Sequence, residues 1–258
     1  MSTLPKSVLG VDIGGTGIKA AIVDTHTGTL LTERHKILTP KPATPQAVAE
    51  VYQHMVEYFR WDGVVGCGFP AIIQHGVARS AANIDDSWIG VDVKALFEQQ
   101  AGLPVTVLND ADVAGMAEMA VGAGAGRMGT VMLITLGTGL GSALFTDGKL
   151  VPNTEFGHFY LRKHKVVVEK YCSNMIRKRD NLSWIEWTAR FNEYLKLLDR
   201  LFTPDLYILG GGGSKHFDVF KDMLVTNAEV VPAVYQNRAG VIGAAVAAAT
   251  VHQMVTSS

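Results

Sequence analysis

The sequence predicts an α/β protein built from two related halves, each a mixed sheet flanked by helices. One pattern occurs twice: an apolar strand, a glycine-rich turn with one threonine, and a second apolar strand, at Val8–Asp24 and again at Val131–Phe145. Helices and strands alternate after each copy. The chain of 258 residues is long enough for two modest domains with ample core.

The first half begins as a meander and continues as alternating helices and strands. The expected strands are 7–13, 17–24, 28–38, 63–69 and 105–108, and the expected helices are about 46–60 and near 91–101. Pro70 to Gly90 is irregular and rich in small and polar residues, which suits a binding loop.

The second half restarts at Thr130 with its own hairpin, and a helix is expected at about 166–179. Ser183 and Glu186 form a capping box before a long apolar stripe at helical spacing, which Pro204 ends. A strand at 206–209 runs into a glycine run and another helix, and an alanine-rich helix begins near Arg238.

We expect two lobes that meet near a hinge helix at about 111–128. The smaller lobe is predicted at residues 1–112 and the larger at 113–258, and the last helix, about 240–253, can pack back on the smaller lobe.

Composition sets bounds on function. The chain is 48% hydrophobic and 18% charged with net charge -1, so we expect neither nucleic acid nor a membrane as partner. No apolar run reaches the ~20 residues of a membrane span, and the first strand follows Lys6 without a signal peptide. Cys67 and Cys172 indicate neither a disulfide framework nor a four-cysteine metal site, so a cytoplasmic setting is expected.

Both glycine-rich turns are candidate phosphate-binding sites. Dinucleotide folds and P-loops run from glycines into a helix, whereas here a second strand follows, so each turn reads as a hairpin. Glycine is expected there because tight turns use positive φ and let a ligand approach the backbone. Each turn alone reads equally well as an ordinary hairpin. The pair, with Asp12, Thr16 and Thr138, favours a phosphate- or nucleotide-binding cleft.

Three further groups are candidates for chemistry. Asn109–Asp110 lies where a strand ends and a helix begins, so Asp110 either accepts a substrate proton or caps the helix. Glu155 and His158 flank Gly157 and either converge on a small ligand or form a capped turn. The run Gly210–Gly213 either admits a ring or ribose close to the backbone or is a flexible loop.

Basic residues gather between Arg162 and Arg179, with seven cations against the single acid Glu169. The cations are Arg162, Lys163, Lys165, Lys170, Arg177, Lys178 and Arg179. Such a run suits a long polyanion, because weak ion contacts add and release counterions. The alternative is a solvated helix face.

Together these motifs resemble the ROK family of sugar kinases, within the sugar kinase, Hsp70 and actin superfamily, over essentially the whole chain. The resemblance implies a two-lobed actin-like, ribonuclease H-like fold. The matching motifs are Asp12-Ile13-Gly14-Gly15-Thr16, Leu136–Gly141, Gly210–Gly212, Asn109–Asp110, Glu155–His158 and Val168–Ser173.

The resemblance also implies roles for individual residues. Asp110 is implied as the catalytic base. The implied sugar-binding residues are Asn83, Asn109, Asp110, Glu155, His158 and Glu169. The implied donor-binding residues are Asp12, Gly14, Gly15, Thr16, Lys19, Gly137, Thr138, Gly139, Gly211 and Gly212, with Mg²⁺ near Asp12.

Two departures narrow the resemblance. Most family members carry a zinc-binding cluster of three cysteines after the Glu-x-Gly-His motif, whereas here only Cys172 lies near, so no zinc site is expected. The subgroup that lacks the cluster is the polyphosphate glucokinases, which this chain also resembles at 83–90, 145–155 and 180–184. Pro70–Ala71 stands where the family usually has Pro-Gly.

The resemblance therefore implies a cytoplasmic, homodimeric kinase that phosphorylates the 6-hydroxyl of glucose, with mannose as a second candidate sugar. Polyphosphate or ATP is the implied donor and Mg²⁺ the implied cofactor. One alternative is a strictly ATP-dependent ROK hexose or N-acetylhexosamine kinase. Another is a sugar-sensing regulator, which the short stretch before the first strand disfavours because such regulators carry an N-terminal DNA-binding segment.

Overall fold

The computed structural model describes residues 4–81 and 84–256. Its contacts divide the chain into two compact units. One contains the chain up to Val121 and again from Arg238, and the other is Gly122–Asn237. The division falls at the end of α3 (Asp110–Val121), so this helix belongs with the first sheet, as does the C-terminal helix α8 (Ala239–Thr256).

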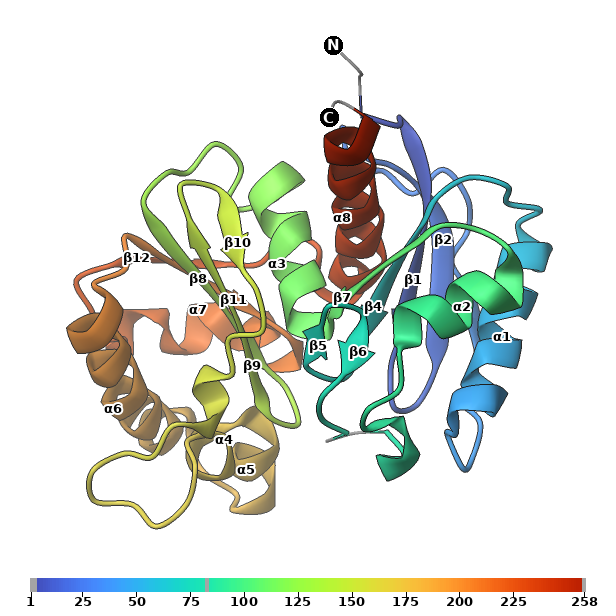
Figure 1. The fold of residues 1–258 in the computed structure, drawn as a ribbon. Helices are drawn as coiled ribbons and strands as arrows, with labels where there is room; N and C mark the ends of the chain where they lie inside the picture. The colour runs from blue at the N-terminus through green and yellow to red at the C-terminus, as the bar shows by residue number, and fades with distance from the viewer. Residues whose placement is uncertain (1–3, 82–83, 257–258) are drawn as a thin grey trace. The chain divides into compact units, whose positions relative to one another are not determined.

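Each unit is built on one five-stranded mixed sheet among the described residues, and the two sheets have the same topology (Figure 1). The first has the order β3-β2-β1-β4-β7, from β1 (Ser7–Ile13), β2 (Ile18–Asp24), β3 (His35–Ile37), β4 (Val65–Phe69) and β7 (Val105–Asn109). The second has the order β10-β9-β8-β11-β12, from β8 (Thr130–Leu136), β9 (Leu140–Thr146), β10 (Lys149–Val151), β11 (Leu206–Gly210) and β12 (Glu229–Pro232).

In both sheets three strands form an antiparallel meander, and two further strands run parallel to the first strand of that meander. The predicted repeat and the predicted fold class are therefore confirmed. Both glycine turns connect antiparallel strands, which confirms that they are hairpins rather than strand-to-helix loops.

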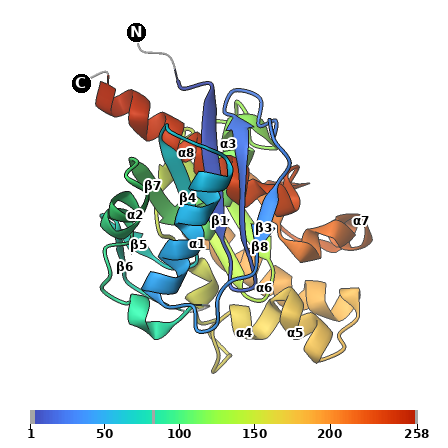
Figure 2. The same cartoon turned by 90° about the vertical axis from the view of Figure 1, so that its right-hand side faces the viewer.

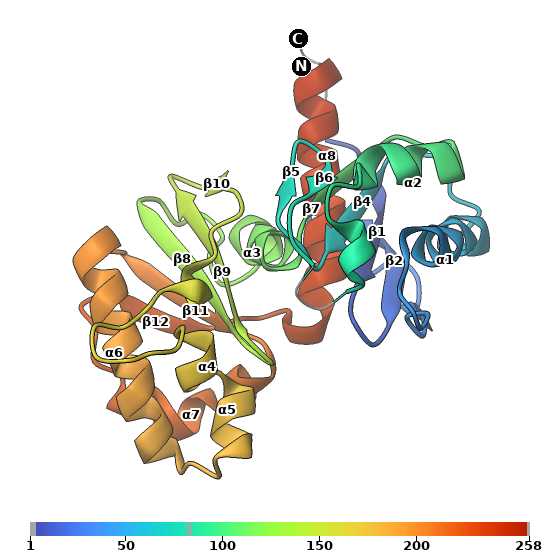
Figure 3. The same cartoon turned by 60° about the horizontal axis from the view of Figure 1, so that its bottom comes forward.

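Helices cover both faces of the first sheet (Figures 2 and 3). On one face lie α1 (Pro45–Tyr58) and α2 (Val93–Ala101), whose Tyr52 and Phe97 rings stack with centroids 4.4 Å apart. On the other face α8 packs on β1 and β4 and beside α3. The small elements β5 (Ile73–Gln74), β6 (Val77–Ala78) and the 3-10 helix η1 (Asp86–Trp88) follow β4.

The alanine-rich sequence of α8 is explained by how closely it approaches the sheet. A Cβ on Gly10 or Gly66 would collide with backbone carbonyls of α8, so only side chains as small as hydrogen fit there. By length and composition alone Gln236–Thr256 is apolar enough to cross a membrane, with mean hydropathy 1.4, yet 56% of that window is buried. Its contacts are those of a core helix.

In the second unit α6 (Trp184–Phe202) packs along one face of the sheet with α7 (Phe217–Phe220). The predicted capping box is present: Ser183 Oγ accepts from the Glu186 amide, and the Glu186 carboxylate accepts from the Ser183 amide at 2.9 Å. Shorter elements complete the unit: α4 (Glu169–Cys172), α5 (Asn174–Arg179), η2 (Phe156–His158), η3 (Gly212–His216), η4 (Lys221–Met223) and η5 (Gln236–Arg238).

Two predicted elements are wrong in extent, and one strand was missed. The helix expected at about 166–179 breaks at Ser173, which is extended and whose Oγ accepts from the Ile176 amide at 3.3 Å, so it caps a new helix. The strand expected at 28–38 shrinks to β3, because Thr32 Oγ1 rather than a strand neighbour accepts from the Ile22 amide. The edge strand β12 was not predicted.

Candidate active site

The first glycine turn presents backbone donors at the end of the first sheet. The Gly14 amide is used within the turn, since it donates to the Gly17 carbonyl at 3.2 Å. Gly15 and Thr16 form the exposed tip, and their amides donate no hydrogen bond to another described residue. Two amides and the Thr16 hydroxyl are therefore available to an anion.

The expectation that the glycines of these turns adopt positive φ is wrong. Positive φ occurs at eight glycines among the described residues, and none belongs to either phosphate turn. Crowding explains some of these glycines instead. A Cβ at Gly17 would lie 2.6 Å from Lys36 Cε, and a Cβ at Gly139 would collide with the Glu169 carboxylate.

The second turn repeats the arrangement of the first. The Gly137 amide donates to the Gly139 carbonyl at 3.1 Å, and Thr138 is exposed at the tip. Beside it ends β11, where Gly210 pairs with Thr135. Gly211 has φ 75° and packs on Leu136, while a Cβ on Gly212 would meet nothing within 4 Å. The glycine run thus borders open space next to the second turn.

Asp12 lies beside the first turn as one half of an ion pair. It is directly opposite Lys19, and Lys19 Nζ lies 2.9 Å from Asp12 Oδ2. A Cβ on Gly240, in the first turn of α8, would lie 2.7 Å from Asp12 Cγ, so the carboxylate is held between a lysine and a helix N-terminus.

Asn109 and Asp110 follow β7 at the same edge, because β1, β4 and β7 are parallel. Asn109 Oδ1 accepts from the Ala111 amide at 2.8 Å, and its Nδ2 donates to the Ala71 carbonyl at 3.1 Å. Asn109 therefore caps α3 and holds the Pro70–Ala71 loop. Asp110, the first residue of α3, is exposed, and the capping role considered for it belongs to Asn109.

Glu155, His158 and Glu169 come together in the second unit. Gly157 makes this possible, because a Cβ there would collide with the Leu140 carbonyl, so η2 lies directly on the start of β9. His158 Nδ1 lies 3.8 Å from Glu155 Oε2. Burial raises the pKa of Glu155 above 4.5, His158 opposes that rise, and the nearby Glu169 charge adds to it. Asn83 lies outside the described residues.

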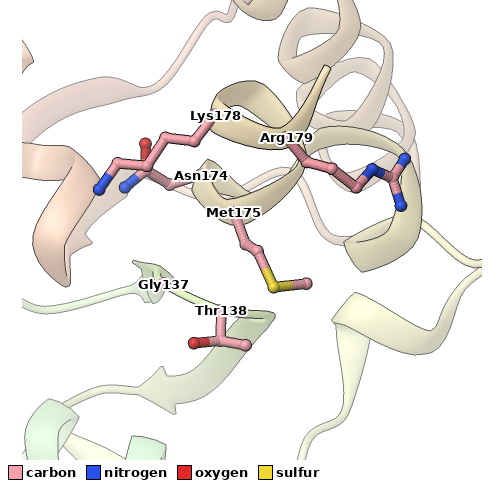
Figure 4. A pocket seen from close by; sticks show the side chains of 6 residues that line it. All are labelled: Gly137, Thr138, Asn174, Met175, Lys178 and Arg179. Atoms are coloured by element: carbon pink, nitrogen blue, oxygen red, sulfur yellow. The ribbon is translucent and has the colours of Figure 1, made fainter. Parts of the chain in front are cut away.

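A pocket of about 520 Å³ opens between the second turn and α5 (Figure 4). Its lining residues are Gly137, Thr138, Asn174, Met175, Lys178 and Arg179. The Met175 amide donates to the Gly137 carbonyl at 3.1 Å, which ties the helix to the turn. Asn174 and Met175 were missed in the sequence, because only the cap at Ser173 directs the start of α5 at this turn.

The basic stretch is divided between two segments of the chain. The loop that carries Arg162, Lys163 and Lys165 runs between η2 and α4, and it lies apart from α5 in Figures 1 and 3. All three of these residues are exposed. Of the cations of α5, Lys178 and Arg179 line the pocket.

The three cations of α5 also differ among themselves. Arg177 is committed to the fold: its guanidinium lies 4.1 Å from the Trp184 ring centroid and donates to Asn174 Oδ1 and the Leu182 carbonyl. Arg179 pairs with Asp180 through two hydrogen bonds of 2.7 and 3.2 Å. Lys178 is exposed and forms no ion pair within the described part of the chain.

Two topologically equivalent mixed sheets, each with a threonine-bearing glycine turn, define a member of the actin-like ATPase superfamily. The sequence model of the ROK family matches residues 8–175, and the chain belongs to the ROK family. A polyphosphate glucokinase of Mycobacterium tuberculosis (strain CDC 1551 / Oshkosh) is 42% identical over 247 residues, covering 95% of this chain and 92% of that protein.

Solved structures give the same relationship. The inorganic polyphosphate/ATP-glucomannokinase from Arthrobacter sp. strain KM is 47% identical, with TM-score 0.88 over 96% of this chain and 100% of that one. A ROK family glucokinase from Streptomyces griseus, solved with glucose and AMPPNP, is 28% identical with TM-score 0.78, over 95% of this chain and 99% of that one.

Proposed function

We propose that this protein is a glucokinase that transfers a phosphoryl group from polyphosphate or ATP to the 6-hydroxyl of glucose. The observation that carries the choice of donor is the pocket at Thr138, which Lys178 and Arg179 line from α5. A phosphate turn with two cations beside it suits a donor whose chain of phosphates continues beyond the one that is transferred. The named relatives that span the chain support the same activity.

Asp110 is the general base of the proposed reaction. Its carboxylate accepts the proton of the 6-hydroxyl as that oxygen forms a bond to the terminal phosphorus. The bond from phosphorus to the bridging oxygen breaks, and the electron pair leaves with ADP or with a polyphosphate shortened by one unit. Asn109 positions the base through its cap on α3.

Glu155, His158 and Glu169 hold the remaining sugar hydroxyls. Each sugar hydroxyl both donates and accepts hydrogen bonds. Carboxylates accept from hydroxyls and an imidazole donates or accepts, so these three side chains can satisfy both. The side chain of Glu155 is two-thirds covered, with 32% exposed, which strengthens its hydrogen bonds.

The Asp12 carboxylate is suited to be one protein ligand of a Mg²⁺ ion. Magnesium in phosphoryl-transfer sites takes one or two carboxylates together with donor phosphates and water, and Asp12 supplies one carboxylate next to the first turn. No described residues form a group of three or more potential protein ligands, so the donor phosphates and water supply the rest. When bound, Mg²⁺ neutralises charge on the transferring phosphate.

The test combines donor assays with one variant. Purified protein is given glucose with ATP or long-chain polyphosphate, and glucose 6-phosphate is measured. Asp110→Asn keeps the shape of the side chain but not its basicity, so kcat falls by ~10²–10⁴ while glucose affinity is kept. Asp62→Asn, an exposed carboxylate of the same unit, is the control. Wild-type protein inactive with both donors refutes the activity, and an Asp110→Asn kcat above about a tenth of wild type refutes the base.

The homodimer, the cytoplasmic setting and mannose as a second sugar remain predictions from the resemblance. Size-exclusion chromatography with light scattering tests the first, and a competition assay between glucose and mannose tests the last.

A further inference from the structure

Three charged residues form a row across the first sheet beside its glycine turn. Asp12 of β1 is directly opposite Lys19 of β2, and Lys19 is directly opposite Lys36 of β3. Directly opposed residues in antiparallel strands place their side chains on the same face. The row therefore brings two lysines and one acid to the turn end of one face.

The charges of this row do not cancel. Lys19 Nζ lies 2.9 Å from Asp12 Oδ2, so these two neutralise each other. Lys36 is exposed and forms no ion pair with a described residue. One positive charge thus remains beside the first turn.

Lys36 leans along the sheet toward that turn. Its Cε would lie only 2.6 Å from a Cβ at position 17, so the aliphatic stem of the lysine crosses directly over Gly17. Gly17 comes two residues before Lys19 on the way to the exposed tip. The carbon that bears the ammonium therefore lies beside the last glycine of the turn, and glycine at 17 leaves room for this path.

The chain after Lys36 is fastened to the turn as well. Thr39 is buried, with 7% exposed, and its hydroxyl donates to the Gly14 carbonyl. Ile37 pairs with Ile18, the first residue of β2. These contacts fix the backbone from which Lys36 projects.

We propose that Lys36 binds the phosphates of the phosphoryl donor at the first turn. The proposal rests on the proposed function, since it assigns a residue to the donor of that reaction. The free amides of Gly15 and Thr16 offer neutral hydrogen bonds to a phosphate, and Lys36 supplies the charge that the Asp12–Lys19 pair does not. The recognised group is the phosphoanhydride that ATP and polyphosphate share.

The main test is Lys36→Ala, assayed with Mg-ATP and with long-chain polyphosphate. The KM for either donor rises by about 5- to 30-fold, as expected for one charge-assisted hydrogen bond at an exposed site, while the KM for glucose stays the same. Lys36→Arg keeps most donor affinity because it keeps the charge. Lys6→Ala, an exposed lysine before β1 at the opposite end of the strand from the turn, is the control.

Gly17→Ala tests the path of the lysine. The added methyl displaces the Lys36 stem, so the donor KM rises, and in a Lys36→Ala background the same methyl has little further effect. Circular dichroism confirms that the variants are folded. A donor KM for Lys36→Ala within twofold of wild type overturns the proposal, as does an equal rise in Lys6→Ala.

Failure of this proposal is distinguishable from failure of the proposed function. Calorimetric titration with Mg-ATP measures donor binding without turnover. If the wild type lacks kinase activity but Lys36→Ala still weakens ATP binding, the kinase assignment fails and the role of Lys36 stands. If the wild type is an active kinase and Lys36→Ala binds ATP as wild type does, only the role of Lys36 fails.

Discussion

Alanine variants of the three cations of α5, made one at a time, test which of them bind the donor and which only stabilise the fold. Arg177, Lys178 and Arg179 are adjacent in sequence, yet the first is held by Trp184 and two hydrogen bonds and the third by Asp180. The side chain of Lys178 forms no ion pair with a described residue. If the pocket at Thr138 binds polyphosphate, some of the single alanine variants change the melting temperature and others change the polyphosphate KM.

The structure sets the expected magnitudes. Arg177→Ala loses a cation–π contact and two hydrogen bonds at partly buried sites, together about 1–3 kcal/mol, which lowers the melting temperature by roughly 2–10 °C. Lys178→Ala leaves the melting temperature unchanged but raises the polyphosphate KM by about 5- to 30-fold. Arg179→Ala has a smaller effect on this KM, since Asp180 already engages its guanidinium.

Salt dependence supplies the independent readout. The KM for long polyphosphate rises with ionic strength, and the slope of its logarithm against log salt decreases by about 0.7–0.9 when one phosphate contact is lost. ATP, with three phosphates held mainly at the glycine turns, responds less. Three variants with the same melting temperature and the same donor KM would refute the distinction between structural and donor-binding cations. Equal changes in KM for both donors would mean that α5 does not select polyphosphate and is a solvated helix.

Three further predictions follow from single contacts. Gly157→Ala drives η2 off the Leu140 carbonyl, destabilises the protein by about 1–3 kcal/mol in denaturant titration, and raises the glucose KM most, whereas Gly148→Ala, in a turn with open space, should leave the glucose KM as it is. Glu155→Gln lowers kcat/KM for glucose by about 10- to 100-fold. Because the pKa of Glu155 is raised in the folded protein, the protonated carboxyl contributes fully to stability below pH 4.5, and this contribution is lost as pH rises through the raised pKa. The Glu155→Gln variant therefore has a higher melting temperature than wild type at pH 7, and the difference shrinks toward pH 4. Removal of metal with EDTA abolishes activity and Mg²⁺ restores it, while elemental analysis finds far less than one zinc per chain; stoichiometric zinc would contradict the reading of Cys67 and Cys172.

The fold was predictable because its signals are local. Alternating apolar residues, the Ser183 capping box and the duplicated glycine turns each report on a few neighbouring residues, and together they predicted the fold class and the family correctly. Boundaries failed where a side chain competes with the backbone for hydrogen bonds. Ser173 breaks a helix and Thr32 shortens a strand, although both positions fit the longer element by pattern alone.

The site was predictable only in part, since several of its features depend on contacts between distant residues. The pattern around Asn109 did not reveal that its amide holds Ala71 as well as α3. A count of charges grouped Arg177 with Lys178, although a tryptophan seven residues further on engages the first. Lys36 was missed because its place beside the turn follows from the pairing of β3 with β2, in a segment expected to be one long strand.

The two glycine turns admit side chains of opposite charge beside equivalent glycines. In the first unit a glycine leaves room for the stem of Lys36, so a cation approaches the turn. In the second unit a glycine at the equivalent turn leaves room for the Glu169 carboxylate, so an acid approaches it.

An acid next to a phosphate turn opposes anion binding, and Lys170 Nζ lies only 3.2 Å from Glu169 Oε1 to offset it. The placement fits the proposed sugar-binding role of Glu169. A carboxylate that binds the sugar and packs on Gly139 would hold the acceptor hydroxyl next to a phosphate bound at the same turn. If both turns bind the donor, the residue that each glycine admits distinguishes them: the first turn receives a cation, Lys36, and the second receives the carboxylate proposed to bind the sugar, Glu169.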